Sequence, residues 1–125
     1  MRRSLPAVAV LVLAVSLTSC SSDGGSTLSD AASAGRSVFI SNGCAACHGS
    51  DGAGGVGPTL VALIGSTSEF IDGTSIVADR DYVIESIMDP AARKVAGYSI
   101  PMPMNNLDRD AVESIVDYIE ELTAP

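Results

Sequence analysis

Two cysteines, Cys44 and Cys47, stand with two alanines between them and are followed directly by His48, the only histidine of the 125-residue chain. Thiols at this spacing can add to the two vinyl groups of a haem and form thioether bonds. The adjacent imidazole can then bind the iron through Nε2 as the proximal ligand. The pattern predicts one covalently bound haem c, attached through Cys44 and Cys47.

The same Cys-x-x-Cys pattern also occurs in thioredoxin-like dithiols and in halves of zinc sites. A zinc site needs further ligands, but the chain has no second histidine, and its remaining cysteine, Cys20, lies far upstream. A redox dithiol is expected at a helix start within alternating strands and helices, which the flanking sequence does not show. Haem attachment is the favoured interpretation, and these two stay as alternatives.

The N-terminus resembles a bacterial lipoprotein signal. It begins with Met1-Arg2-Arg3, continues as an apolar run and ends at Leu17-Thr18-Ser19-Cys20, which resembles a lipobox. The run is shorter than the roughly 20 apolar residues that cross a bilayer. We therefore expect residues 1–19 to be a signal peptide and Cys20 to be lipidated. Two acyl chains on Cys20 would anchor the protein on the outer face of the bacterial cytoplasmic membrane.

Residues 20–29 are rich in Ser, Gly, Thr and Asp, so we expect a flexible tether after the lipid. Residues 30–125 are expected to form a single domain with one haem, because the chain shows no internal repeat and no second attachment motif. With two thiols assigned to haem and one to lipid, no disulfide is expected.

The chain is acidic, with a formal net charge of -8 from 7 basic and 15 acidic residues. Loss of Arg2 and Arg3 with the signal peptide would bring the charge to about -10. Such a charge argues against nucleic acid as a partner and favours redox proteins with a basic docking patch, among them respiratory complexes. Solubility of an exported protein would explain the same charge.

Three amphipathic segments predict an all-α fold. The first is expected from Asp30, as its cap, to about Asn42, with Ala31, Ala34 and Val38 on its apolar face beside Phe39. The second is expected from Asp79 or Asp81 to the stop at residues 89–90, with four apolar residues on one stripe: Val83, Ile84, Ile87 and Met88. The third is capped by Asp108 and has the clearest apolar stripe: Val112, Ile115, Val116, Ile119 and Leu122.

A glycine-rich loop, residues 49–58, follows the cysteine motif and predicts close approach of backbone to the haem edge. At its end, Pro58 lacks an N–H, but its carbonyl can accept a hydrogen bond from the outer N–H of a liganding histidine.

Two methionines are candidates for the sixth iron ligand. Met88 falls on the apolar face of a predicted helix, where we expect it to pack in the core. Met102 and Met104 lie in an irregular stretch with two prolines, residues 97–107, which we call the methionine loop. A stiff loop of this kind can hold a weak thioether ligand. A Met ligand opposite His48 raises the reduction potential and closes both axial positions, which favours electron transfer over ligand binding.

Six stretches together resemble the class I cytochrome c domain family, and most closely the cytochrome c domain fused to some bacterial cytochrome oxidase subunits II. They are residues 43–48, 57–60, 72–74, 82–90, 95–98 and 102–103. The copper ligands and paired transmembrane helices of such subunits are absent from the sequence. The resemblance therefore implies a small class I cytochrome c fold, with three to five helices around one haem, set free and given a lipid anchor.

The resemblance also implies a role for each matching residue. Cys44 and Cys47 would form the thioethers, His48 would be the proximal ligand, Pro58 its carbonyl partner and Met102 the distal ligand, with Met104 as the alternative. Gly35, Phe39 and Tyr118 would pack the first helix against the last. Candidates for the haem propionates are Tyr98, Arg80, Arg93 and Lys94, and the exposed haem edge is expected beside Ala45, Ala46, Val56 and the methionine loop.

The function predicted from these residues is that of an electron carrier, not an enzyme: a membrane-anchored monohaem cytochrome between a quinol-oxidising complex and a terminal oxidase. Two alternatives remain. One is the haem subunit of a membrane-bound dehydrogenase, which co-purification with a catalytic partner would identify. The other is a haem-based sensor, which requires a distal ligand that opens.

Overall fold

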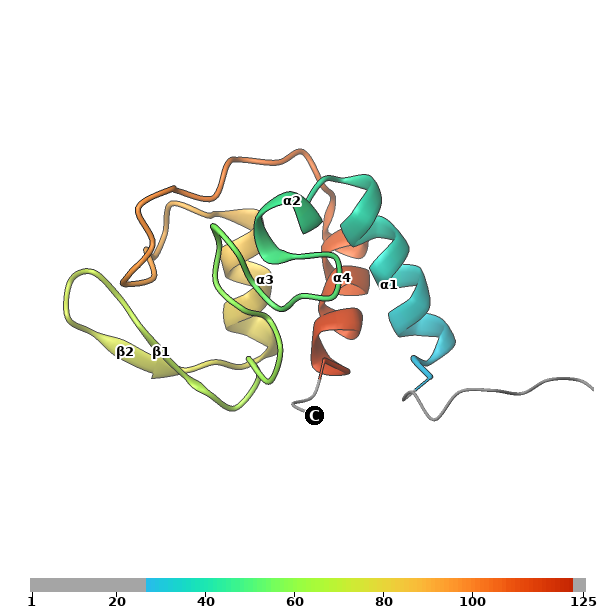
Figure 1. Cartoon of the computed structure of the whole chain (residues 1–125), viewed down its shortest axis with the longest axis horizontal. Helices are drawn as coiled ribbons and strands as arrows, with labels where there is room; N and C mark the ends of the chain where they lie inside the picture. The colour runs from blue at the N-terminus through green and yellow to red at the C-terminus, as the bar shows by residue number, and fades with distance from the viewer. Residues whose placement is uncertain (1–26, 123–125) are drawn as a thin grey trace, which may run out of the picture.

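The computed structural model describes residues 27–122, which form four helices and one two-stranded hairpin (Figure 1). The predicted signal peptide, Cys20 and most of the predicted tether lie outside the described residues. The mostly helical fold is confirmed, whereas the small hairpin was not predicted. The elements are α1 (Asp30–Ser41), α2 (Ala45–His48), β1 (Thr67–Glu69), β2 (Ser75–Val77), α3 (Arg80–Met88) and α4 (Arg109–Glu120).

Helices α1 and α4 pack closely at Gly35. A Cβ atom built on Gly35 would lie 1.8 Å from the carbonyl oxygen of Ser114, so only a glycine permits this approach of the two backbones. Beside it, the rings of Phe39 and Tyr118 lie 5.5 Å apart at an interplanar angle of 59°, and both side chains are buried. The predicted packing of Gly35, Phe39 and Tyr118 is confirmed.

The start and the buried face of α1 differ from the prediction. The hydroxyl of Ser29 accepts the N–H of Ala32 at 3.1 Å, so Ser29 is the N-cap and Asp30 is the first helical residue. The buried face consists of Ala32, Gly35 and Phe39, while Ala31 and Ala34 are exposed. The face of α1 that packs on the domain carries the small residues Ala32 and Gly35. Hydrophobicity alone does not distinguish the buried Ala32 from the exposed Ala31 and Ala34.

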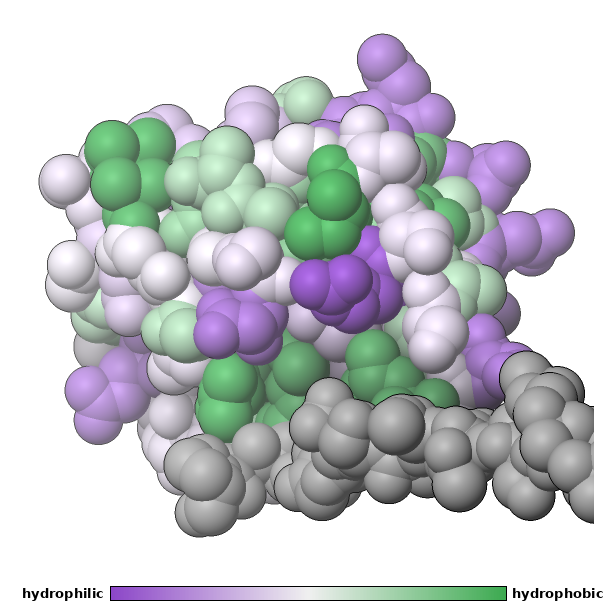
Figure 2. Space-filling model, turned by 45° about the vertical axis from the view of Figure 1, so that its right-hand side comes forward, coloured by the Kyte–Doolittle hydropathy of each residue, from purple (hydrophilic) through white to green (hydrophobic). Residues whose placement is uncertain are grey.

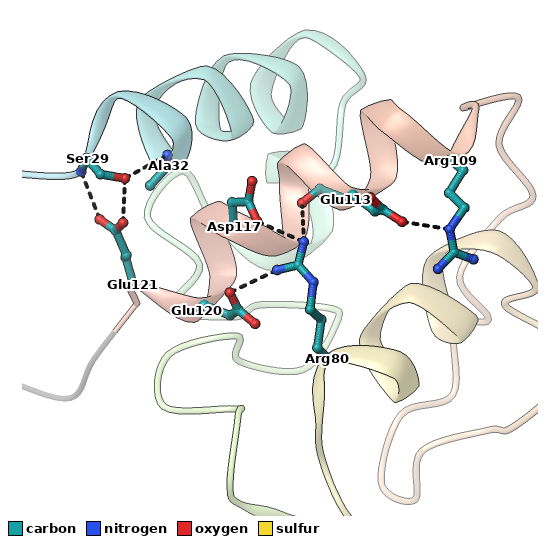
Figure 3. A network of polar contacts seen from close by, with 8 residues as sticks. All are labelled: Ser29, Ala32, Arg80, Arg109, Glu113, Asp117, Glu120 and Glu121. Carbon is teal, nitrogen blue, oxygen red and sulfur yellow. Dashed lines mark hydrogen bonds and ion pairs between the residues drawn. The ribbon is translucent and has the colours of Figure 1, made fainter.

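The packed domain begins before Asp30. Leu28 packs against the core. Ser29 donates through its backbone N–H and its hydroxyl to the Glu121 carboxylate, at 2.9 and 2.5 Å, and so ties the start of α1 to the end of α4 (Figure 3). These hydrogen bonds hold the pKa of Glu121 below its ordinary value. Residues 28–29, assigned to the tether from the sequence, therefore belong to the domain.

Helices α3 and α4 begin where the sequence predicts. Asp79 accepts the N–H of Tyr82 at 2.8 Å and caps α3, and Asp108 accepts the N–H of Ala111 at 2.9 Å and caps α4. Arg80 joins the two helices through ion pairs with Asp117 and Glu120 on α4, at 2.8 and 2.9 Å (Figure 3). These pairs are partly exposed, so they fix the orientation of α3 more than they stabilise the fold.

Residues of α3 and α4 form most of the core. The predicted stripe of α4 is buried, and Leu122 packs against the core just beyond the helix end. On α3 the buried residues are Tyr82, Val83, Ile84 and Ile87, whereas Met88 is 42% exposed. Three of the four predicted residues are thus buried, and the prediction of Met88 as a core residue is wrong, because the buried face is displaced toward Tyr82 and leaves Met88 at its edge.

The hairpin region is hydrogen-bonded to the segment that precedes the methionine loop. Strands β1 and β2 pair antiparallel, with Ser68 opposite Ile76. Phe70, the residue after β1, forms an isolated antiparallel bridge with Val95.

On the face shown in Figure 2, hydrophobic residues are interspersed with hydrophilic ones. Among residues 27–122, no helix is both long enough and apolar enough to cross a membrane.

Candidate functional site

The two cysteines and the histidine occupy one short helical turn. Cys44 stands at the N-cap of α2, and its carbonyl accepts the N–H groups of Cys47 and His48, at 3.2 and 3.0 Å. The N–H of Cys44 donates in turn to the carbonyl of Phe39 in α1, at 3.2 Å. Gly43, with φ of 76°, makes the turn between the two helices. The core residue Phe39 thus fixes where this motif lies.

His48 is held in a defined orientation and tautomer. Its Nδ1 lies 2.9 Å from the carbonyl oxygen of Pro58. A carbonyl oxygen can only accept, so Nδ1 carries a proton and, in the neutral imidazole, Nε2 keeps its lone pair. The carbonyl partner predicted for His48 is therefore found in the structure, and the ring presents Nε2 as a metal-ligating atom.

The glycine-rich loop packs against this histidine. A Cβ built on Gly57 would lie 3.0 Å from Cε1 and 3.2 Å from Nδ1 of His48. The N–H of Gly57 donates to the carbonyl of Cys47, and the N–H of Gly54 donates to that of His48, at 3.0 and 2.8 Å. The close approach that the structure shows is thus to the histidine ring. Gly57 was missed as a site residue, although its position before Pro58 was a usable indication.

Both thiols are half-buried and free of disulfide bonds. Burial raises the pKa of the Cys44 thiol above its ordinary value, and the neighbouring Cys47 adds to the rise. Over residues 27–122, no three His, Cys, Asp or Glu side chains are grouped as a metal site would need. Cys44, Cys47 and His48 share one helical turn without forming such a group, and two thiols and one imidazole at this spacing are what covalent haem attachment requires.

The two candidate distal ligands differ in burial. Met102 is half-buried and packs against the core, whereas Met104 is 68% exposed. Both belong to the long segment between α3 and α4, which crosses the same end of the molecule as α2 (Figure 1). Among the three described methionines, Met102 is the one whose side chain turns toward the interior.

The candidate propionate partners are not equivalent. Arg80 is engaged with α4 as described above, so its guanidinium is already committed. Arg93 pairs with Glu85 at 3.0 Å and lies over the Phe70 ring, 5.7 Å from its centroid. Tyr98 is 40% exposed, and Lys94 is exposed as well. Of the expected rim of the haem edge, Ala46 and Val56 are exposed, while Ala45 packs against the core.

A small helical domain with two free thiols and an oriented imidazole on one turn defines a class of protein, the electron-carrying haem domains. These residues fit a covalently attached haem. Gly57 has no Cβ and so leaves room for the His48 ring, and the Pro58 carbonyl sets the tautomer of that ring. The chain belongs to the cytochrome c family, whose family model, described as Cytochrome c, matches residues 32–123. No curated protein matches the sequence.

Membership of this family makes the chain an electron-carrying haem protein rather than a catalytic enzyme. The family implies haem c bound covalently, and Cys44, Cys47 and His48 have the spacing of the attachment motif. The described helices and hairpin are consistent with the class I fold.

Proposed function

We propose that this protein is a lipid-anchored monohaem cytochrome c that carries single electrons on the outer face of the bacterial cytoplasmic membrane. In this proposal Cys44 and Cys47 hold one haem, His48 is the proximal ligand and Met102 the distal ligand. The observation that carries the proposal is the 2.9 Å contact between Nδ1 of His48 and the carbonyl oxygen of Pro58. His48 shares one helical turn with both thiols, whereas Pro58 ends the glycine-rich loop. When bound, haem supplies an iron centre that accepts and releases one electron.

The protein's own residues would orient and protect that centre. Pro58 keeps the proton of His48 on Nδ1 and makes the imidazole a stronger donor at Nε2. Gly57 lies against the ring, so the imidazole has little freedom to rotate. A rigid ligand sphere changes little when the charge of the iron changes, which favours fast electron transfer.

Burial supports Met102 over Met104 as the distal ligand. A thioether that packs against the core is already placed inside the domain, whereas the side chain of Met104, 68% exposed, would have to leave solvent and turn inward. Pro101 and Pro103 on either side of Met102 reduce the entropy that the loop loses on ligation.

The acidic charge supports redox partners with basic docking patches. A quinol-oxidising complex as donor and a terminal oxidase as acceptor would fit a carrier on this side of the membrane. The lipobox-like sequence at Cys20 supports the anchor. Isolation from its source in a stable complex with a dehydrogenase would instead favour the subunit alternative.

An optical spectrum of the protein, matured in a haem-attaching host, tests the proposed site. We expect a covalent c-type haem and, in the oxidised form, the weak long-wavelength band of a methionine sulfur bound to ferric haem. A c-type spectrum that lacks this band, with carbon monoxide binding to the reduced protein, would favour the sensor alternative. Absence of covalent haem would contradict the proposal and return the thiols to other chemistry.

Replacement of Cys20 tests the anchor. We expect Cys20→Ala to release the cytochrome into the soluble fraction or to leave it unprocessed, because the acylated thiol would be lost. Membrane fractionation and the mass of the mature N-terminus measure this effect. A Ser19→Ala variant keeps the thiol and serves as the control. Membrane anchoring of Cys20→Ala in a processed form would contradict the lipoprotein assignment.

A further inference from the structure

The methionine loop makes very few hydrogen bonds. Within the described chain, residues 97–107 take part in only two, and both use the side-chain amide of Asn105. Two prolines in this segment, Pro101 and Pro103, have no N–H to donate. A single side chain therefore supplies the polar attachment of the whole segment.

The first bond joins the loop to α3. Nδ2 of Asn105 donates to the carbonyl oxygen of Ile87 at 2.7 Å, across 18 residues of sequence. Ile87 is in the last turn of α3, where carbonyls lack an intrahelical partner, and its own side chain is buried in the core. The loop is thus fastened to a backbone atom that cannot move without displacing the core.

The second bond shapes the loop itself. Oδ1 of Asn105 accepts the N–H of Leu107 at 3.2 Å, and Leu107 packs against the core just before α4 begins. The partners fix the orientation of the amide, because a carbonyl can only accept and an N–H can only donate. Asn105 thus joins the end of α3, the loop and the approach to α4.

We propose that Asn105 is a positioning residue that holds the methionine loop closed, with Met102 against the domain, and so keeps the distal position from opening. The inference rests on the proposed function of Met102. Asn105 lies three residues after Met102, and the residues between them, Pro103 and Met104, are exposed and make no hydrogen bonds. Beyond Met102, the nearest attachment of the loop on that side is therefore Asn105.

Competition by imidazole for the ferric haem protein tests this role. A small ligand binds only when the distal methionine leaves, so its apparent affinity reports the population of the open state. Loss of one neutral hydrogen bond is expected to raise the imidazole affinity of Asn105→Ala about 2- to 12-fold. Asn105→Asp removes the donor to Ile87 but keeps the acceptor for Leu107, and should raise the affinity at least as much, because a carboxylate oxygen then faces the Ile87 carbonyl.

The matched control is Asn106→Ala, since Asn106 is the exposed neighbour and makes no hydrogen bond in the described chain. It should leave imidazole affinity unchanged. Guanidinium unfolding, measured in parallel, separates the effect from general destabilisation: the affinity change must exceed that of a core variant of equal stability, such as Ile115→Val. The Asp variant keeps the test decisive if Asn105→Ala does not mature.

Two failures can be told apart. If the wild-type protein lacks the methionine-sulfur band, the proposed function fails. If the band is present but both Asn105 variants bind imidazole as the wild type does, the positioning role is overturned while the proposed function stands.

Discussion

Replacement of Met102 by alanine is expected to abolish the methionine-sulfur band and to lower the reduction potential by roughly 0.1–0.3 V, within the range that axial ligands span. As the proposed distal ligand, the Met102 thioether would stabilise the reduced iron, and its loss would leave the distal position to water. Covalent attachment should survive, because Cys44 and Cys47 lie on another element. Absorption spectroscopy and a potentiometric titration measure both effects.

Met104→Ala is the matched control. Its side chain is 68% exposed and lies two residues away in the same loop. It should keep the band and nearly the same potential. A Met102→Ala protein that retains a six-coordinate low-spin haem at an unchanged potential would refute this ligand, and loss of the band in Met104→Ala alone would transfer the role to Met104.

Gly35→Ala is expected to destabilise the packed domain strongly. The new methyl group would lie 1.8 Å from the carbonyl oxygen of Ser114, a backbone atom that can give way only if α1 separates from α4. Overpacking of this kind costs about 3 kcal/mol or more, and the better helix propensity of alanine returns only about 1 kcal/mol. Guanidinium unfolding of the haem-loaded protein should therefore show a net loss of about 2 kcal/mol or more.

Ser33→Ala is the control for this change, because Ser33 is an exposed residue of the same helix. It should alter the unfolding free energy by no more than about 0.5 kcal/mol. Equal stabilities of Gly35→Ala and the wild type would mean that the two helices can separate without loss, and that the contact at Gly35 does not determine their packing. The separation should also disturb the Phe39–Tyr118 pair, which near-ultraviolet circular dichroism can follow.

Much of the site could be predicted because its chemistry is local. Cys44, Cys47 and His48 share one helical turn, so their proximity follows from spacing alone. The caps at Asp79 and Asp108 are local as well, since each side chain bonds an N–H three residues onward. The apolar period of α4 likewise predicted its buried face, because large aliphatic side chains leave little doubt about orientation.

The predictions failed where contacts between elements determine a helix cap or a buried face. The sequence permitted a cap at Asp30, but Ser29 occupies it and is itself bound by Glu121, 92 residues away. Burial of Met88 depended on which side of α3 meets α4, and a single helix does not contain that information. The hairpin was missed although Thr67, Ile76 and Val77 favour strands, because each strand has only three residues and is too short to show an apolar alternation.

By itself, the sequence determined the cofactor chemistry, the helical class and the starts of α3 and α4, because those depend on residues a few positions apart. The Pro58 carbonyl and the packing of Gly35 were also expected, and the structure supplies their geometry. Only the tertiary structure set Gly57 against the histidine ring and joined Asn105 to Ile87. The two hydrogen bonds join atoms 2.9 and 2.7 Å apart, and the glycine contacts leave no room for a Cβ atom. Chain folding brings these groups together across the sequence, and no sequence period encodes such contacts.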